Sequence, residues 1–536
     1  MNKYFFILLL SYPLIIMGQV TELSRDFFKS KRDEFRKKLP EASVAVLFSA
    51  PIRNRANDVN YVYHQDPSFY YLSGWKEPNA VLLIYKEAQK DDQGIFYNKI
   101  FIRSSDPVDE MWNGKYTTPQ EALSMGFDRV DTRVDFSSKT PVFSDFDKVL
   151  LFEFKNDERD NPADPYDLYD LKKSFKEKIN FPEIYDRKKY VLYQKIKNIE
   201  ESSADSLRSE LQGLVTLDPS LLEDQILKDF LDSSHLDVLN EIRQKTAFAI
   251  KDYNFDLEKL PQIMKGLREI KTEEEIELIR KAAFFSAVGQ VEVMKAIHSG
   301  MSEREIQGIH EFVYRKYGAA DQGYPSIVGA GGNACVLHYI ENNKFELNNE
   351  LVLMDLGAEL SGYTADVTRT IPSSGTFTPD QRLLYEIVYA SQEKGIQAAV
   401  IGNSFVDIYK ACFDTIALGL IELGIIETTS EVKKYFPHGV SHHIGLDVHD
   451  PGIYGFLAAD MIITVEPGIY IPEDSPCDPR WWNIGIRIED DILITEKGPK
   501  NLSSFAPRKW DEIEKIIQQK SPLDDFNLPS AESLSK

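Results

Sequence analysis

Four carboxylates in the second half of the chain lie inside runs of apolar or β-branched residues: Asp355, Asp366, Glu466 and Glu489. An isolated ionised acid is costly to bury, so each run restricts how the chain can fold. Four of the nine histidines also lie within twelve residues, from His438 to His449. Two divalent cations would balance four clustered carboxylates. We therefore expect the acids to converge, with a histidine, on a dinuclear metal centre of a hydrolase.

The first two acids are expected to lie on one β-hairpin. Two β-rich segments flank a polar, glycine-containing turn, which is a typical hairpin pattern. If Leu360 and Ser361 form the two-residue loop, Asp355 and Asp366 are directly opposed, with Cβ atoms about 5 Å apart on one face. Like charges placed in this way destabilise a sheet unless a cation lies between them. The spacing alone is a weak indication in a chain with 85 acidic residues.

The other two acids lie in separate β-rich segments. Glu466 ends one strand, and Glu489 lies within residues 484–495. Period-two alternation puts Arg487, Glu489 and Asp491 on one face of that strand. An ion pair between Arg487 and Glu489, without any metal, is therefore an open alternative for this acid taken alone.

The histidine cluster restricts the ligand set further. His442 and His443 are adjacent and point to opposite sides of any strand, so at most one of them binds a metal directly. Oxygen-rich ligation with a single imidazole suits Mn²⁺ better than Zn²⁺, with Co²⁺ and Zn²⁺ as alternatives.

Composition excludes several classes of protein. The 536 residues suffice for two or three domains. A net charge of −23 argues against nucleic acid as a partner. Three widely spaced cysteines without a C-x-x-C pair indicate neither a disulfide framework nor a zinc ribbon. They leave room for one disulfide.

The N-terminus predicts export. The apolar run from Phe5 to Ile16 is too short for an ordinary membrane span but suits a signal peptide over residues 1–18, cleaved after Gly18. No cysteine follows directly, and no later segment reaches the length of a membrane span. We expect a secreted or periplasmic protein without a stable membrane anchor. An amphipathic or buried N-terminal helix is the alternative.

Two globular domains are expected, of mixed α/β (α+β) class. Residues 22–250 predict an N-terminal α/β domain with a mixed sheet and a charged helical insertion near 156–240. The second domain spans 262–518, because every suspected metal ligand lies there. The polar end, 519–536, predicts a disordered tail.

Helix starts can be predicted in the second domain. Thr272 and Glu275 form a capping box, with apolar residues at helical spacing after it. We expect long helices at about 272–298 and 302–317, and another near 379–398.

The spacing of Asp355, Asp366, His442, Glu466 and Glu489 resembles the five-ligand pattern of the pita-bread metallopeptidases. The surrounding segments resemble the aminopeptidase P (Xaa-Pro aminopeptidase) group. They are residues 326–333, 337–339, 362–370, 438–442, 446–450, 465–468 and 485–491, with 66–74 and 77–83 in the first half. The resemblance covers roughly 24–155 and 262–518, and it implies a C-terminal pita-bread domain.

The resemblance also implies a role for each ligand. Asp366 and Glu489 would bridge both metals, Asp355 would bind one metal, and His442 and Glu466 would bind the other. A hydroxide bridging the two metals would attack the carbonyl carbon of the bond between an N-terminal residue and a following proline.

Further residues are assigned roles by the same resemblance. Glu466 would handle the proton, and His338 and His449 would contact the substrate and stabilise the tetrahedral intermediate. His438 and Arg487 would line the pocket near the proline. Trp112 resembles a tryptophan that reaches the site of a neighbouring subunit, which implies a homo-oligomer, either a dimer or a tetramer.

Two other functions remain as alternatives. A prolidase shares the ligands but cleaves only Xaa-Pro dipeptides, and Ser441 before His442 favours the aminopeptidase pattern. A non-catalytic, peptide-binding pita-bread module belongs to a different class. The presence of all five ligands argues against it.

Overall fold

The computed structural model describes residues 21–155, 157–233 and 236–524. The chain divides into two compact units, Lys29–Pro261 and Gln262–Lys536, the second of which also includes Met1–Phe28. The predicted signal peptide and residues 525–536 of the predicted tail lie outside the described residues. Across the described ranges, no helix combines the length and the apolarity that crossing a bilayer requires.

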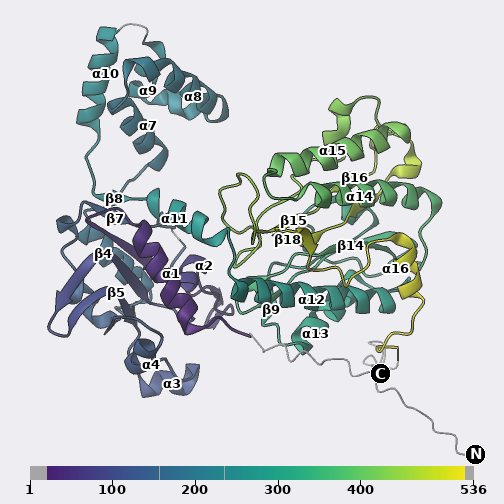
Figure 1. The fold of residues 1–536 in the computed structure, drawn as a ribbon, viewed down its shortest axis with the longest axis horizontal. Coiled ribbons are helices and arrows are strands. Elements are labelled where there is room, and N and C mark those ends of the chain that lie inside the picture. Colours follow the sequence, from purple (N-terminus) through teal and green to yellow (C-terminus); the bar gives the residue numbers. More distant parts are fainter. Residues whose placement is uncertain (1–20, 156, 234–235, 525–536) are drawn as a thin grey trace, which may run out of the picture. The chain divides into compact units, whose positions relative to one another are not determined.

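The unit Lys29–Pro261 is built on a six-stranded mixed sheet, as predicted (Figure 1). The strand order is β6-β5-β4-β1-β7-β8. β1 pairs antiparallel with β4 and parallel with β7. The strands are β1 (Ser43–Phe48), β4 (Val81–Asp91), β5 (Gly94–Ile102), β6 (Arg129–Thr132), β7 (Lys148–Leu150) and β8 (Phe255–Asp256), with a separate hairpin of β2 (Asn54–Ala56) and β3 (Val59–Asn60).

Helices contribute to the core beside this sheet. Leu171 and Phe175 of one helix belong to the same apolar cluster as Val44 and Val46 of β1. Alternate residues of β1 therefore face that helix. The helices of this part are α1 (Arg25–Lys38), α2 (Pro67–Ser73), α3 (Pro107–Asn113), α4 (Pro119–Ser124), α5 (Phe136–Lys139) and α6 (Leu168–Lys178), the last of which carries Leu171 and Phe175.

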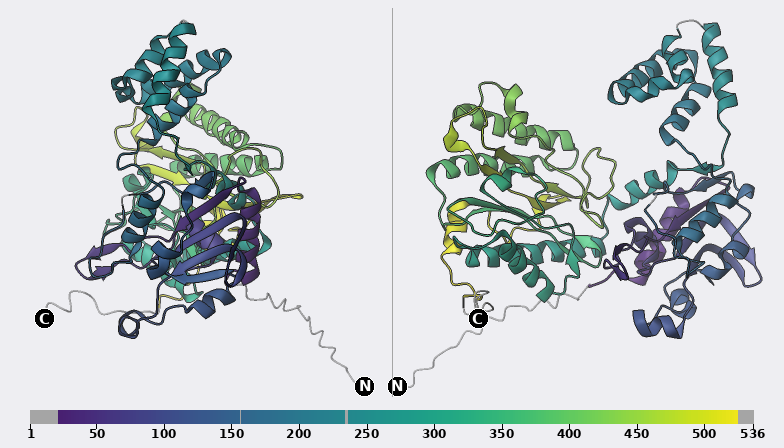
Figure 2. Two further views of the ribbon diagram at one scale, coloured as in Figure 1. Left: turned by 90° about the vertical axis from the view of Figure 1, so that its left-hand side faces the viewer. Right: turned by 180° about the vertical axis from the view of Figure 1, so that it is seen from behind.

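The charged stretch near 156–240 is helical, and most of it forms a small core of its own. The helices α7 (Arg187–Lys197), α8 (Ala204–Leu217), α9 (Gln225–Asp232) and α10 (Leu236–Ala249) lie together in all three views (Figures 1 and 2). Leu192, Ile196, Leu211, Phe230 and Ile242 form the centre of their apolar cluster. Each helix buries its apolar face against the others, which explains why so charged a segment folds.

The second unit consists of two helix pairs and several small antiparallel sheets. Figure 1 shows the strands between the pair α12 and α13 and the pair α14 and α15. The helices are α11 (Lys259–Arg268), α12 (Glu273–Ala296), α13 (Glu303–Lys316), α14 (Pro379–Ala398), α15 (Phe405–Glu422) and α16 (Trp510–Ile517). The strands are β9 (Asp321–Gln322), β10 (Ile327–Ala330), β11 (Leu351–Asp355), β12 (Ala358–Leu360), β13 (Tyr363–Thr364), β14 (Thr368–Pro372), β15 (Ile462–Val465), β16 (Gly468–Ile471), β17 (Ile484–Arg487), β18 (Asp490–Thr495) and β19 (Gly498–Asn501).

The helix starts follow their local sequence. Thr272 and Glu275 form the predicted capping box of α12, and both of its hydrogen bonds are present. Ser302 and Thr378 cap α13 and α14 in the same way. Because these side chains satisfy backbone N–H groups that have no intrahelical partner, the three predicted helices begin within one residue of the expected positions.

The predicted register of the Asp355–Asp366 hairpin is wrong by two residues. Ser361 and Gly362 form the loop, Leu360 pairs with Tyr363, and Asp355 lies opposite Thr368. Ser361 and Gly362 have φ angles of 52° and 86°. A type I′ turn needs positive φ at both central residues, and glycine at the second position makes that turn favourable. Asp366 therefore lies in the break between β13 and β14, but it stays on the same side as Asp355.

The expected single strand over 484–495 is also wrong. β17 ends at Arg487 and β18 begins at Asp490, and the two strands belong to different sheets. Pro467 faces this break, and its carbonyl accepts a hydrogen bond from the N–H of Ile488. Proline cannot donate a ladder hydrogen bond, so the pairing is interrupted here and both chains change sheet. Glu489 lies in the interruption.

The three cysteines are unpaired. Cys412 is buried, while Cys335 and Cys477 are partly buried. The disulfide for which the sequence left room is therefore absent from the described residues.

Candidate metal centre

A cavity of about 380 Å³ in the second unit gathers almost all of the predicted site residues. It is lined by Leu337, His338, Asp355, Asp366, His438, Gly439, Ser441, His442, His449, Tyr454, Glu466, Arg487 and Glu489. The five expected metal ligands come from five separate segments: the four acids lie at strand ends or in interruptions between strands, and His442 lies in an irregular segment beside the isolated bridge between His443 and Ile463. At these places a side chain can turn out of the sheet without leaving a row of ladder hydrogen bonds unpaired.

Three of the five predicted ligands converge most tightly. One ligand atom each from Asp366, His442 and Glu489 lies within 4.8 Å of the other two. His442 Nε2 lies 3.5 Å from Asp366 Oδ2 and 3.4 Å from Glu466 Oε1. His442 therefore stands between the acid expected to bridge the metals and Glu466, which was expected to share its metal.

The electrostatics of the cluster fit divalent cations. Burial and the neighbouring carboxylates raise the pKa of Glu489 well above its ordinary value, and they raise the pKa of Asp366 as well. Burial, opposed by His442 and reinforced by Asp366, raises the pKa of Glu466 to about 7. Burial and the mutual repulsion of the carboxylates both disfavour the ionised acids, and cations in the same place would offset both effects.

Asp355 is held by two side chains. Tyr324 donates its hydroxyl to Asp355 Oδ1 at 2.5 Å and also lies 2.6 Å from Asp366 Oδ1. Arg487 Nη2 donates to Asp355 Oδ2 at 2.7 Å. The pairing between Arg487 and Glu489 that was left open is not formed. Instead, Thr368 donates to Glu489 Oε2 at 2.6 Å.

The remaining cavity histidines have distinct surroundings. The ring of His449 packs edge-on against that of His442, with centroids 4.3 Å apart. His438 Nε2 lies 2.9 Å from the hydroxyl of Tyr470. His338 lines the cavity wall. His443 points away from the metal cluster, as the alternation predicted, and is fully buried against Phe405 and Tyr454.

Trp112 is the one predicted site residue that does not line this cavity. It lies on α3 in the unit Lys29–Pro261 and is 82% exposed. A single chain does not test a contact with a neighbouring subunit, so the role of Trp112 stays a prediction.

Sequence reasoning missed three residues that hold other side chains of the site in place. Tyr324, Thr368 and Tyr470 hold Asp355, Glu489 and Arg487, respectively. Thr368 belongs to the segment 362–370 that carried the family resemblance, so its position gave a signal. Tyr324 and Tyr470 are ordinary aromatic residues in sequence, and only the three-dimensional packing brings their hydroxyls to the site.

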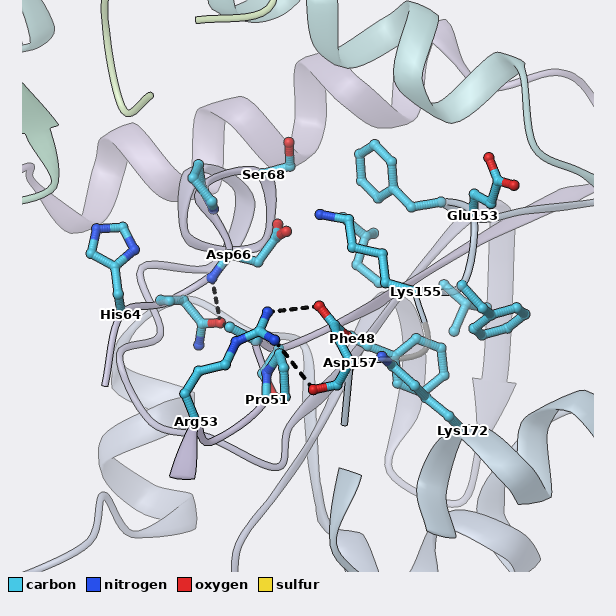
Figure 3. A pocket seen from close by; sticks show the side chains of 18 of the residues that line it. Phe48, Pro51, Arg53, His64, Asp66, Ser68, Glu153, Lys155, Asp157 and Lys172 are labelled. Atoms are coloured by element: carbon cyan, nitrogen blue, oxygen red, sulfur yellow. Dashed lines mark hydrogen bonds and ion pairs between the residues drawn. The ribbon is translucent and has the colours of Figure 1, made fainter. Parts of the chain in front are cut away.

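A second and larger cavity, of about 560 Å³, lies in the other unit at the carboxyl ends of β1 and β7 (Figure 3). Several of the cations that line it are paired with acids. Arg53 pairs with Asp157 at 2.6 Å, and Lys172 pairs with Glu158 at 2.8 Å. Among the described residues, none of the acids lining it belongs to a group of three convergent ligands. Despite its size, this cavity lacks the chemistry of the metal centre.

The helix pairs, the small sheets and the carboxylate-rich cavity define a metallopeptidase of the pita-bread class. The sequence matches the family described as "Metallopeptidase family M24" over residues 277–496 and "Aminopeptidase P, N-terminal domain" over residues 28–145. Together with a relative that is 30% identical over nearly its whole length, these matches show that the chain belongs to the aminopeptidase P family. The family and fold class predicted from the sequence are thereby confirmed.

Curated relatives align with nearly the whole chain. The Xaa-Pro aminopeptidase of Haemophilus influenzae is 30% identical over 515 residues, which cover 94% of this chain and 99% of the relative. That of Escherichia coli is 28% identical over 510 residues, covering 93% and 99%. Human Xaa-Pro aminopeptidase 3 is 28% identical over 490 residues, covering 89% and 81%.

Solved structures share the fold. Zinc-substituted aminopeptidase P of E. coli in complex with product superposes with a TM-score of 0.71 at 28% identity, covering 92% of this chain and 98% of that one. Aminopeptidase PepP of Pseudomonas aeruginosa gives 0.72 at 27% identity, covering 93% and 98%.

Proposed function

We propose that this chain is a metal-dependent Xaa-Pro aminopeptidase that releases the N-terminal residue preceding a proline. The observation that carries the proposal is the convergence of Asp355, Asp366, His442, Glu466 and Glu489 in one cavity with His338 and His449. The same chain aligns over 93% and 94% of its length with the Xaa-Pro aminopeptidases of E. coli and H. influenzae.

The substrate bond sets the chemical task. The amide before a proline is tertiary and has no N–H, so a site that selects it must accept the ring and polarise the carbonyl without using that hydrogen bond. When bound, two divalent cations supply a Lewis acid for the carbonyl and lower the pKa of the attacking water.

The proton steps fall to side chains of the cavity wall. Glu466 has a pKa raised to about 7, first by burial, which suits a group that takes a proton from water and returns it to the departing proline nitrogen. His338 and His449 line the same cavity, where they hold the peptide carbonyl and stabilise the oxyanion of the tetrahedral intermediate.

The proline subsite is assigned to the side that carries His438. The ring of His438 packs against the rings of Phe436 and Tyr470, with centroids 5.2 and 5.4 Å away, and these contacts hold the imidazole that would meet a pyrrolidine ring. Arg487 lines the same cavity, and its guanidinium is held by hydrogen bonds to Tyr470, Asp355 and Thr368.

A panel of peptides tests the activity and separates it from the alternatives. The metal-reconstituted protein is incubated with Xaa-Pro dipeptides, Xaa-Pro peptides of three to eight residues, and matched Xaa-Ala peptides. Release of the first residue from the longer Xaa-Pro peptides is expected. Cleavage of dipeptides alone would identify a prolidase. Peptide binding without cleavage under any metal would identify a non-catalytic module.

We assign Mn²⁺ as the metal, because four carboxylates and one imidazole form an oxygen-rich ligand set. Stripped protein reconstituted with Mn²⁺ is expected to be more active than protein reconstituted with Co²⁺ or Zn²⁺ at equal occupancy. Higher activity with Zn²⁺ would reject the assignment.

Export and assembly are proposed on separate grounds. The apolar run from Phe5 to Ile16 supports cleavage after Gly18 and a secreted or periplasmic location. N-terminal sequencing of the protein from its native host tests this proposal. The exposure of Trp112 supports a homo-oligomer in which this side chain reaches a neighbouring copy. Sedimentation of wild-type protein and of Trp112→Ala tests that contact.

A further inference from the structure

One irregular loop carries two residues of the cavity wall. Between Gly445 and Tyr454 the backbone forms neither helix nor strand, yet His449 and Tyr454 both line the cavity. A loop without ladder hydrogen bonds needs other contacts to hold such side chains in place. The structure provides them from the segment 268–271, which joins α11 to α12.

A buried ion cluster ties this segment to the loop. Arg268 Nη2 donates to Asp450 Oδ1 at 2.5 Å and to Asp447 Oδ2 at 2.8 Å. Lys271 Nζ donates to Asp450 Oδ2 at 2.8 Å. The side chains of Lys271 and Asp450 are 1% exposed and that of Arg268 is 3% exposed. Both oxygens of Asp450, the residue after His449, are therefore held by cations.

Further contacts fix the loop on both sides of Asp450. Asp450 Oδ1 also accepts from the N–H of Asp447 at 3.2 Å. Glu269 Oε2 accepts from the N–H of Ile453 at 2.8 Å. A Cβ atom at Gly445 would lie 2.6 Å from Asp450 Oδ2, so the loop folds tightly around this carboxylate.

We propose that Asp450, held between Arg268 and Lys271, is a positioning residue that sets the place of His449 and Tyr454 in the cavity. The inference rests on the proposed function, because the role of His449 belongs to it. A buried ion cluster adds little stability compared with apolar residues of the same volume, but it is directional. The geometry matches such a device, since the anion adjoins His449 in sequence and is bonded to the backbone of its own loop.

Hydrogen exchange tests the contact without using activity. In Asp450→Asn, Arg268 and Lys271 lose their shared charge partner. We expect amide exchange in residues 445–454 to become at least about tenfold faster, while exchange in α12 stays the same. Unchanged exchange in the loop would overturn the proposal. If Asp450→Asn does not fold, Lys271→Met keeps the pair between Arg268 and Asp450 and takes its place, with the same expectation.

A double-mutant cycle tests the effect on His449. With the metal content kept at the wild-type level, Asp450→Asn is expected to lower kcat/KM for an Xaa-Pro peptide by about tenfold or more. In a His449→Ala background the same change is expected to cost less than about twofold, because the residue that it positions is already gone. Equal losses in both backgrounds would show a general structural role and reject the proposal.

A control variant tests whether the effect is specific, and a separate result distinguishes failure of this proposal from failure of the proposed function. Glu158→Gln breaks a buried ion pair in the other unit, whose side chains are 11% and 8% exposed, and is expected to leave kcat/KM within about twofold. A tenfold loss in this control would remove the specificity of the claim. Wild-type protein without peptidase activity would reject the proposed function, whereas the exchange experiment would still decide whether Asp450 holds the loop.

Discussion

At the scale of single residues, Tyr324 shows how much of the metal centre depends on groups that bind no metal. Its one hydroxyl lies between Asp355 and Asp366. The hydroxyl has one proton, so it can donate to only one of the two carboxylates at a time. It nevertheless contacts both and so restricts the orientation of each. Groups that orient metal ligands commonly contribute a factor of 10 to 100 in metal affinity or activity.

Tyr324→Phe is therefore expected to lower metal affinity or kcat/KM by about 10- to 100-fold while the fold is kept. Isothermal titration with Mn²⁺ and steady-state kinetics measure the two effects. Tyr385→Phe is the matched control, since Tyr385 is also fully buried and its hydroxyl donates to Arg508 O at 2.8 Å outside the cavity. An equal loss in both variants would mean that the role of Tyr324 is general packing.

A second residue-scale prediction concerns His310 on α13. Burial lowers the pKa of His310 to about 4, and its Nε2 bonds to Ser286 O at 3.1 Å. Between pH 6.5 and 4 the unfolded chain binds a proton here that the folded chain does not, so stability is lost as the pH falls. Because of this one group, the free energy of unfolding is about 2 kcal/mol lower at pH 5 than at pH 7.

The variant His310→Gln removes this proton and keeps a side-chain donor. Its free energy of unfolding is expected to fall by about 2 kcal/mol less than that of the wild type between pH 7 and pH 5. Urea unfolding at the two pH values measures the difference. Parallel pH dependence in the two proteins would show that His310 does not titrate as its burial requires.

At the scale of helices and strands, local chemistry predicted starts better than pairings. The capping boxes at Thr272, Ser302 and Thr378 involve residues three apart, and sequence shows such pairs directly. The hairpin register depended on a single turn. The prediction placed its loop at Leu360 and Ser361, although the glycine that a type I′ turn favours lies one residue later, at Gly362.

The same turn provides a test. Gly362→Ala places a Cβ at φ 86° and is expected to destabilise the second unit by about 1–2 kcal/mol. Gly213→Ala on α8 is a control of opposite sign, because nothing lies within 4 Å of its new Cβ and alanine favours a helix interior by about 0.5–1 kcal/mol. Thermal unfolding of both variants measures the two changes. Equal stability of Gly362→Ala and wild type would contradict the turn assignment.

At the scale of the whole molecule, the site was predictable because its acids lie within segments that are otherwise apolar or β-branched. A carboxylate within an apolar segment needs a partner, and four such positions, Asp355, Asp366, Glu466 and Glu489, could be named before the structure was known. The strand break at Glu489 was not predictable in the same way, since it depends on Pro467 of a different segment. The separate core of α7–α10 could not be predicted either. Its apolar residues are scattered among charged ones along the sequence, and only the packing of the four helices brings them together.

The metal centre also couples the stability of the second unit to protons. Glu466 has a pKa raised to about 7, first by burial, and the pKa of Glu489 is raised well above its ordinary value by burial and by Asp366. Without cations the raised pKa values favour the protonated acids, so a cation binds in competition with protons. Metal binding is therefore expected to release protons and to weaken as the pH falls below 7.

Calorimetry of stripped protein tests this coupling. At pH 7.5, Mn²⁺ at 100 times its dissociation constant is expected to stabilise the second unit by about 2.7 kcal/mol. At pH 5.5 the same concentration is expected to stabilise it less, because protonated Glu466 and Glu489 compete with the cation. Titrations in two buffers of different ionisation enthalpy count the protons released. Equal stabilisation at both pH values, with no proton release, would mean that the acids are already ionised in the metal-free protein and that their burial does not control the affinity for metal.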